Sequence, residues 1–197
     1  IMMAMMQNAF ANSSFSLLAG KIQGTIIDLL MPPLSNAELM GGIVAAAITR
    51  GVMVGGALAL AIIVYPGASL GVASIWAIVW FGLMGATMLS LFGLLTSIWA
   101  EKFDHNAMIS TLIVAPLALL SGTFYTIDRL SGAFEAVSRL NPFFYVISGF
   151  RYGFLGQSDI GEGSAPIVQA AIGLGVFNLL LAVLVYQVLK SGWKLKD

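Results

Sequence analysis

Cysteine is absent from the 197 residues, so the chain has no disulfide bond, no thiol nucleophile and no thiolate metal ligand. Charge is also scarce, because only 9% of the residues are Asp, Glu, Lys or Arg, against about 25% in soluble domains. Residues 51–100 and 163–189 contain no charged residue. Each of these two stretches exceeds the roughly 20 residues that cross a bilayer as a helix. With 59% hydrophobic residues, the composition indicates an integral membrane protein, and a net charge of zero gives no reason to expect a nucleic-acid partner.

Recognisable catalytic chemistry is scarce as well. Neither a GxxxxGK[ST] loop nor an HExxH helix occurs, so nucleotide hydrolysis and zinc proteolysis lack their parts. His105 is the only histidine, and although Glu101 and Asp104 are near it, a metal site needs further ligands. A solvated loop is therefore favoured over a metal site there. We expect no catalytic residue, no metal and no cofactor in this chain.

Hydrophobic periodicity predicts an all-α fold, a polytopic bundle of membrane helices forming a single transmembrane domain over residues 1–197. Five spans are expected, at about residues 1–19, 43–65, 72–99, 106–124 and 165–189. The first span has more Asn, Gln and Ser than is usual in a helix that faces lipid, so we expect it to face the other helices of the bundle. Pro116 is expected to kink or break the fourth span, and Ser164 to start the fifth.

Sidedness follows from the distribution of lysine. Alternating spans place the loops 20–40 and 100–105 and the C-terminal tail on one side of the membrane. These three segments carry Lys21, Lys102, Lys190, Lys194 and Lys196. We therefore assign this side, with the C-terminus, to the cytoplasm. Five spans then put residue 1 outside, and we expect a sixth span before it in the native protein.

Small residues predict where helices approach closely. Gly51 and Gly55 repeat at i+4 with Ala47 and Ala59, and Gly82 begins a second such row. This spacing is more often structural than part of a transport path, and it leaves open whether the contact lies within one chain or across a dimer.

Arg50 allows two interpretations, because a charge inside a span is costly. It can lie near the cytoplasmic end of its helix and extend to the interface, with residues 36–45 as a cytosolic extension of that helix. Alternatively, it makes a polar contact inside the bundle.

The cytoplasmic loop 20–40 carries Lys21, Gln23 and Asp28 among aliphatic residues, which is typical of a short amphipathic helix along the membrane face. Pro32 is expected to stop this helix. Ser35 and Glu38 then form an S-x-x-E capping box for the next helix. On local sequence alone, a surface-anchored loop and a docking helix for a cytosolic partner are equally good interpretations.

The outer region 125–163 is expected to hold a re-entrant pair of helices. Asn141 is a good N-cap and Pro142 suits the first helical position. Phe143 then begins an aromatic face that continues through residues 147, 150 and 154. Arg129, Arg151 and the backbone at Gly149 and Gly153 are candidates for an outer gate or for contact with a charged head group. Surface charges on an interfacial helix pair are an equally good reading of the arginines.

Three segments carry a resemblance to a known family: GKIQGTIIDLLMPPLSNAEL, SGTFYTIDRL and LNPFFYVISGFRYGFLGQSD. In this order and spacing the chain resembles the permease subunit of the ABC-2 type exporters over essentially its whole length. The resemblance implies six spans after a cytosolic interface helix, in the bacterial inner membrane. It also implies a dimer of permeases with two ABC ATPase subunits, and ATP and Mg²⁺ held by those partners.

Three groups of residues have expected roles, the first two supported by the resemblance and the third by the spacing of small residues. Coupling to the ATPase is expected at Lys21, Gln23, Gly24, Asp28, Leu30 and Pro32. The outer gate or re-entrant region is expected at Arg129, Asn141, Pro142, Phe143, Gly149, Arg151 and Gly153, and helix packing at Gly51, Gly55 and Gly82. An ATP-driven export permease in contact with membrane lipid is thus the leading prediction. A membrane scaffold with a docking loop is the alternative, and an ion-coupled secondary transporter is disfavoured because no Asp or Glu lies in the middle of a predicted span.

Overall fold

The computed structural model describes residues 1–25, 34–65, 71–121, 140–161 and 163–194. Every regular element in this part of the chain is helical, as the sequence predicts. The elements are α1 (Met2–Gln23), α3 (Asn36–Val64), α4 (Ile75–Trp99), α5 (Phe103–Ile109), the π-helix η1 (Ser110–Val114), α6 (Ala115–Leu119), α8 (Pro142–Leu155) and α9 (Ala165–Ser191).

Three of the described helices are long and apolar enough to cross a membrane, namely α3, α4 and α9. They correspond to the second, third and fifth expected spans. The first expected span is helical over the 22 residues of α1, and the fourth is the shorter apolar helix Phe103–Leu119. Neither α1 nor Phe103–Leu119 is among the three helices that are long and apolar enough to cross a membrane. The total of five spans in this chain therefore stays a prediction, and so does the sixth span before it.

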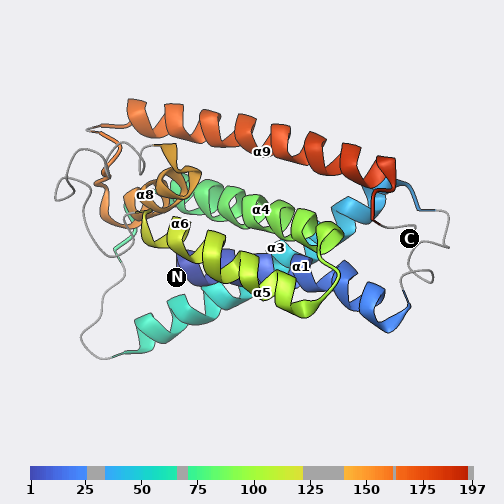
Figure 1. Ribbon diagram of the computed structural model, residues 1–197. Helices are drawn as coiled ribbons and strands as arrows, with labels where there is room; N and C mark the ends of the chain where they lie inside the picture. Colours follow the sequence, from blue (N-terminus) through green and yellow to red (C-terminus); the bar gives the residue numbers. More distant parts are fainter. Residues whose placement is uncertain (26–33, 66–70, 122–139, 162, 195–197) are drawn as a thin grey trace.

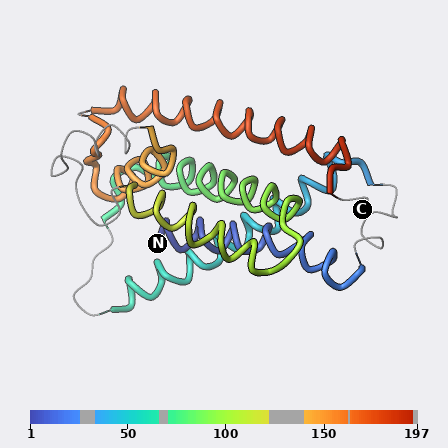
Figure 2. Tube along the Cα trace, viewed as in Figure 1, coloured from blue at the N-terminus to red at the C-terminus, as the bar shows by residue number. Residues whose placement is uncertain are grey.

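The helices α1, α4 and α9 run in one direction, and α3 and the segment α5–η1–α6 run in the other (Figure 1, Figure 2). Helix α4 lies at the centre and packs most extensively on α1. The core is aliphatic and aromatic, and its fully buried side chains include Leu17, Phe81, Met88 and Leu94. The short helix α8 lies at one end, against α4.

Helix α3 begins as its capping box predicts. Ser35 is the N-cap, its hydroxyl accepts a hydrogen bond from the Glu38 N–H at 3.2 Å, and the Glu38 carboxylate accepts from the Ser35 N–H at 2.7 Å. The predicted extension over residues 36–45 is continuous with the span. Arg50 is exposed on this helix and makes no ion pair within the described part of the chain. This argues against a polar contact inside the bundle, and the reach of Arg50 to the interface stays a prediction.

Close approach of α3 and α4 to α1 depends on glycine. A Cβ at Gly51 would lie 2.9 Å from the Met5 carbonyl oxygen, and one at Gly55 would overlap the Met5 side chain. Gly82 is in ordinary contact range, 3.5 Å from Phe150. The closest approach to the backbone of α1 is at Gly93, where a Cβ would lie 2.6 Å from the Phe10 carbonyl oxygen. The predicted packing glycines therefore lie within this chain's own helix contacts.

Pro116 interrupts its helix as predicted. The break is a π-helical turn, η1, directly before α6, where Pro116 occupies one of the first two helical positions. Proline has no N–H and its ring clashes with the carbonyl four residues earlier, so a widened turn before it relieves that clash.

Candidate functional site

An uncharged polar groove runs between α1 and the segment α5–η1–α6. It has a volume of about 390 Å³. The residues that line it are Gln7, Phe10, Ala11, Ser14, Phe15, Asn106, Ala107, Ser110, Val114 and Ala115. The groove thus combines amide and hydroxyl groups with aromatic and aliphatic surface, and none of its lining residues carries a charge.

Asn106 joins the two walls of this groove. The side chain is 3% exposed, and its Nδ2 donates a hydrogen bond to the Ser14 hydroxyl oxygen at 3.2 Å. Its Oδ1 is buried and accepts no hydrogen bond from the described residues. A buried acceptor without a partner costs about 1–3 kcal/mol, and a donor that enters the groove would remove this cost at Asn106.

The face of α1 that turns away from α4 is polar and accessible. Gln7 and Ser16 are exposed, and Asn8 and Asn12 are half-buried. Asn8 satisfies its amide by donating to the Ala4 carbonyl oxygen at 3.0 Å. Such groups are unfavourable against hydrocarbon, so this face is expected to meet water or another protein surface rather than lipid. The sequence predicted a bundle-facing α1, and α1 does pack on α3 and α4 along its opposite side.

Asn141 fixes the start of α8 and also the end of α6. Its Oδ1 accepts from the Phe143 N–H at 3.0 Å, which confirms the predicted N-cap, and Pro142 opens the helix. Its Nδ2 donates to the Leu117 carbonyl oxygen at 2.7 Å. One buried side chain therefore satisfies backbone groups at two helix ends.

Helix α8 is attached to α4 through its two glycines. A Cβ at Gly149 would overlap the ring of Phe81. The Gly153 carbonyl accepts hydrogen bonds from the N–H groups of Ala73, at 2.9 Å, and Ser74, at 2.8 Å. These donors precede α4, so backbone hydrogen bonds connect α8 to the segment that begins α4. The structural role of both glycines is thus visible in the fold.

Arg151 forms an ion pair with Asp159, with 2.5 Å between its NH1 nitrogen and the carboxylate. Both side chains are partly shielded, at 25% and 16% exposed. The pair ties α8 to the segment that leads into α9. The Arg151 guanidinium is therefore partly neutralised by a carboxylate of the same chain, which supports a structural role at least as much as a role in gating.

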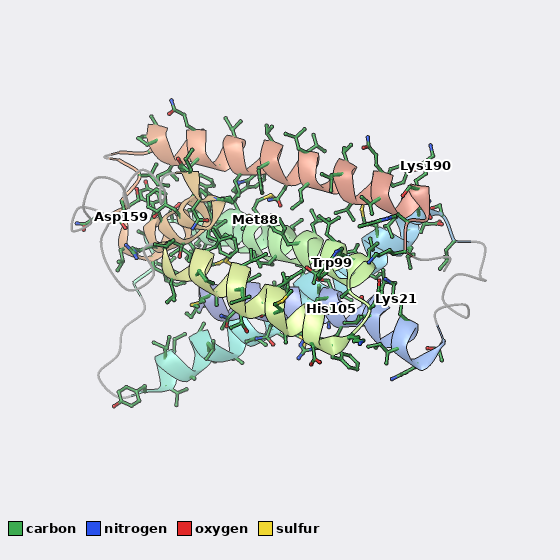
Figure 3. All side chains as sticks on the ribbon, in the orientation of Figure 1. Lys21, Met88, Trp99, His105, Asp159 and Lys190 are labelled. Atoms are coloured by element: carbon green, nitrogen blue, oxygen red, sulfur yellow. The ribbon has the colours of Figure 1, made fainter. Side chains whose placement is uncertain are left out.

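At the opposite end of the bundle, Lys21 and Lys194 approach the C-terminus of α4 near Trp99 and His105 (Figure 3). Lys194 lies 2.7 Å from the Glu101 carboxylate, and this hydrogen bond is the main cause of the lowered pKa of Glu101. Burial lowers the pKa of Lys21, and the Lys194 charge lowers it further. The His105 ring lies 5.4 Å from Trp99, and its Nδ1 accepts from the Glu101 N–H at 3.4 Å. His105 is thus half-buried rather than free in a loop.

Comparison with known protein families gives one clear result. The model of the ABC-2 type transporter family matches residues 1–155. The chain belongs to the ABC-2 type transporter family. The resemblance seen in its sequence motifs is thereby confirmed.

Curated relatives of this ABC-2 protein agree with that assignment. The inner membrane transport permease YadH of Escherichia coli strain K12 is 33% identical over 201 residues, covering all of this chain and 74% of the relative. The YadH permeases of Escherichia coli O157:H7 and Shigella flexneri match equally well. No solved structure matches the chain significantly. The chain is therefore a transport permease rather than an enzyme, and a multi-pass inner membrane protein.

Several residues with predicted roles in this ABC-2 permease lie outside the described residues. They are Asp28, Leu30, Pro32 and Arg129, and the first helix of the expected re-entrant pair lies there too. Lys21 and Gln23 are in the last turn of α1, and Gly24 is its left-handed C-cap. A separate amphipathic helix starting at Lys21 was the expectation, but α1 continues four residues beyond the predicted span end at residue 19. Lys21 is consequently turned into the bundle.

Sequence reasoning missed the two residues that connect the groove walls, Ser14 and Asn106. Both are polar residues in apolar helices, and that signal was available. It could not be used, because Ser14 and Asn106 are separated by 92 residues and no local pattern pairs them. Gly93 was missed for a similar reason, since it does not continue the four-residue repeat that begins at Gly82.

Proposed function

We propose that this chain is the permease subunit of an ATP-driven exporter of the inner membrane. Two copies form the substrate path, and each couples to a separate ABC ATPase that holds ATP and Mg²⁺. The C-terminus and the end of α1 that carries Lys21 face the cytoplasm, where the ATPase acts on residues 20–40. Closure of the ATPases on ATP then alternates the exposure of the path, provided that the two states differ in their contacts with the ATPase and the cargo.

The observation that carries this proposal is the groove of about 390 Å³ between α1 and α5–η1–α6. Its lining is uncharged but hydrogen-bonding, and it includes the exposed side chain of Gln7 in an otherwise apolar protein. A second copy of the chain placed against this face would bury these polar groups around a shared path. The π-helical turn η1 lies in one wall, and such turns are frequent at functional sites.

Single-cysteine crosslinking tests this placement, and the chain offers a background without cysteine. Gln7→Cys, Ala11→Cys and Phe15→Cys place a thiol along the groove, and Leu180→Cys is the control on the exposed face of α9. In membranes treated with a copper–phenanthroline oxidant, at least one groove variant should give a disulfide-linked dimer. The Leu180 variant should stay monomeric. Monomers for all three groove variants would exclude this face as the dimer path.

Energy coupling is tested separately, by coexpression with an ABC ATPase from the same genome. We expect the ATPase to copurify with the tagged permease, and vanadate-sensitive ATP hydrolysis to appear in reconstituted vesicles. If the ATPase binds the permease but no ATP-dependent transport of cargo is measured, the scaffold alternative is favoured. Flux that follows an imposed proton or sodium gradient without ATP would favour a secondary transporter.

A further inference from the structure

Two lysines from distant parts of the chain cap the C-terminal end of α4. An α-helix leaves its last four carbonyl groups without a partner inside the helix. Lys21 donates from Nζ to the carbonyl oxygens of Ser97, at 3.1 Å, and Ala100, at 3.4 Å, and also to that of Ile98. These contacts span 76 to 79 residues of sequence. The last turn of α1 is thereby connected to the end of α4.

Lys194 completes the cap from the other side. Its Nζ donates to the remaining carbonyl, that of Trp99, at 3.4 Å, and to the Glu101 carboxylate at 2.7 Å. It also lies 5.8 Å from the ring centres of Trp99 and Trp193. The backbone of Lys194 has a φ of 55°, a left-handed conformation that costs an L-residue about 1–2 kcal/mol. The hydrogen bonds and ring contacts of the Lys194 side chain offset the cost of this left-handed backbone conformation.

The arrangement is electrostatically consistent. Cations are favoured at a helix C-terminus, where the macrodipole is negative. Two ammonium groups at one helix end repel each other, and the Glu101 carboxylate offsets part of that repulsion. Lys21 is not available to a protein surface outside the bundle while it makes these contacts. Its role therefore differs from the direct ATPase contact that the sequence suggested.

We propose that Lys21 and Lys194 form a lysine clasp that makes the end of α1, the end of α4 and the segment after α9 move as one body. The chain leaves α1 at Gly24 and enters the loop on which the partner is proposed to act. Force on that loop then reaches α4 through Lys21, which is a positioning residue and not a docking residue. This inference rests on the proposed function for the source of the force, but the clasp itself is a property of the permease alone.

Distance measurements between spin labels test the clasp in the full-length permease. Gln23→Cys and Asp104→Cys place labels at exposed positions on either side of it. The wild-type clasp should give one narrow distance distribution in detergent and in lipid nanodiscs. Lys21→Met removes the donor while keeping a long side chain, and we expect a distribution about twofold broader, because the last turn of α1 then loses its hydrogen bonds to the end of α4. Lys21→Arg keeps a donor and should restore the narrow distribution.

Lys102→Met is the matched control, because Lys102 is an exposed lysine between α4 and α5, next to Glu101, and its substitution should leave the distribution unchanged. Lys194→Met provides a second test if Lys21→Met fails to fold, and it too should broaden the distribution. A narrow distribution in both variants would overturn the clasp, and so would broadening by Lys102→Met to the same extent.

A second readout separates the clasp from the proposed function. With an ATPase bound, Lys21→Met should retain ATPase copurification, and vanadate trapping should leave the wild-type label distance unchanged. Loss of copurification in Lys21→Met, with Lys21→Arg equally defective, would show that Lys21 is a docking residue. If no ATPase binds the wild-type chain, the proposed function fails, and the measurements on the permease alone still decide whether the clasp exists.

Discussion

Gly93 lies where α4 approaches the backbone of α1 most closely, and substitution by alanine adds one Cβ at that contact. An added Cβ would lie 2.6 Å from the Phe10 carbonyl oxygen and 3.1 Å from the Ser14 backbone nitrogen, and it would overlap the Ser13 hydroxyl. Two of these neighbours are backbone atoms on the buried side of α1, so they cannot move aside as a flexible side chain can. Overpacking of this kind costs about 1–3 kcal/mol.

The same substitution also raises helix propensity, by about 0.5–1 kcal/mol. Gly56→Ala is a control for that gain, because a Cβ at Gly56 meets nothing within 4 Å. The difference in unfolding free energy between the two variants therefore isolates the overpacking, about 1–3 kcal/mol. At roughly 2–4 °C per kcal/mol for a chain of this size, Gly93→Ala should melt about 2–12 °C below Gly56→Ala.

Thermal unfolding of the purified variants in one detergent, followed by circular dichroism, measures this difference. Equal melting temperatures for Gly93→Ala and Gly56→Ala would refute the close α1–α4 contact. A lower melting temperature for Gly56→Ala than for Gly93→Ala would show that this face of α3 is covered by protein in the assembled state.

Two further perturbations act at the ends of helices. Asn141→Ala should lower the unfolding free energy by about 2 kcal/mol, since it removes one N-cap and one hydrogen bond. Asn141→Ser should lose about half as much, because serine keeps the cap but cannot reach the Leu117 carbonyl. Equal losses of unfolding free energy in the two variants would exclude the contact with Leu117. Glu101 has a lowered pKa, so its ion pair with Lys194 stabilises the fold above the ordinary carboxylate pKa, and that contribution is lost as the pH falls through the lowered value. Melting temperatures measured from pH 6 to pH 3 should fall less steeply in Glu101→Gln than in the wild type, and parallel curves would contradict the ion pair.

Local signals were sufficient to predict where several helices begin. Ser35 with Glu38, and Asn141 with Pro142, each lie within three residues of one another, and both pairs start helices as predicted. Pro116 likewise predicted a break, although the π-helical form of that break depends on how the neighbouring turns pack and was not predicted.

Contacts between distant residues could not be predicted in this way. Lys21 was assigned to a surface helix because its neighbours in sequence are amphipathic, but its Nζ lies on the end of α4. Asn106 was treated as the start of a span, and its partner Ser14 belongs to another helix. In both cases the deciding interaction is a hydrogen bond formed only after the helices have packed, and a single sequence holds no periodicity that reports it.

The hydrogen bonds from Ala73 and Ser74 to the Gly153 carbonyl have a consequence for biosynthesis. A ribosome makes α4 well before α8, so the start of α4 enters the bilayer before its acceptor exists. Lys194, which donates to the Trp99 carbonyl at the other end of α4, is synthesised later still. The central helix is therefore synthesised well before all of its hydrogen-bonding partners exist, and a nascent chain that stops before α8 leaves the N–H groups of Ala73 and Ser74 without their acceptor.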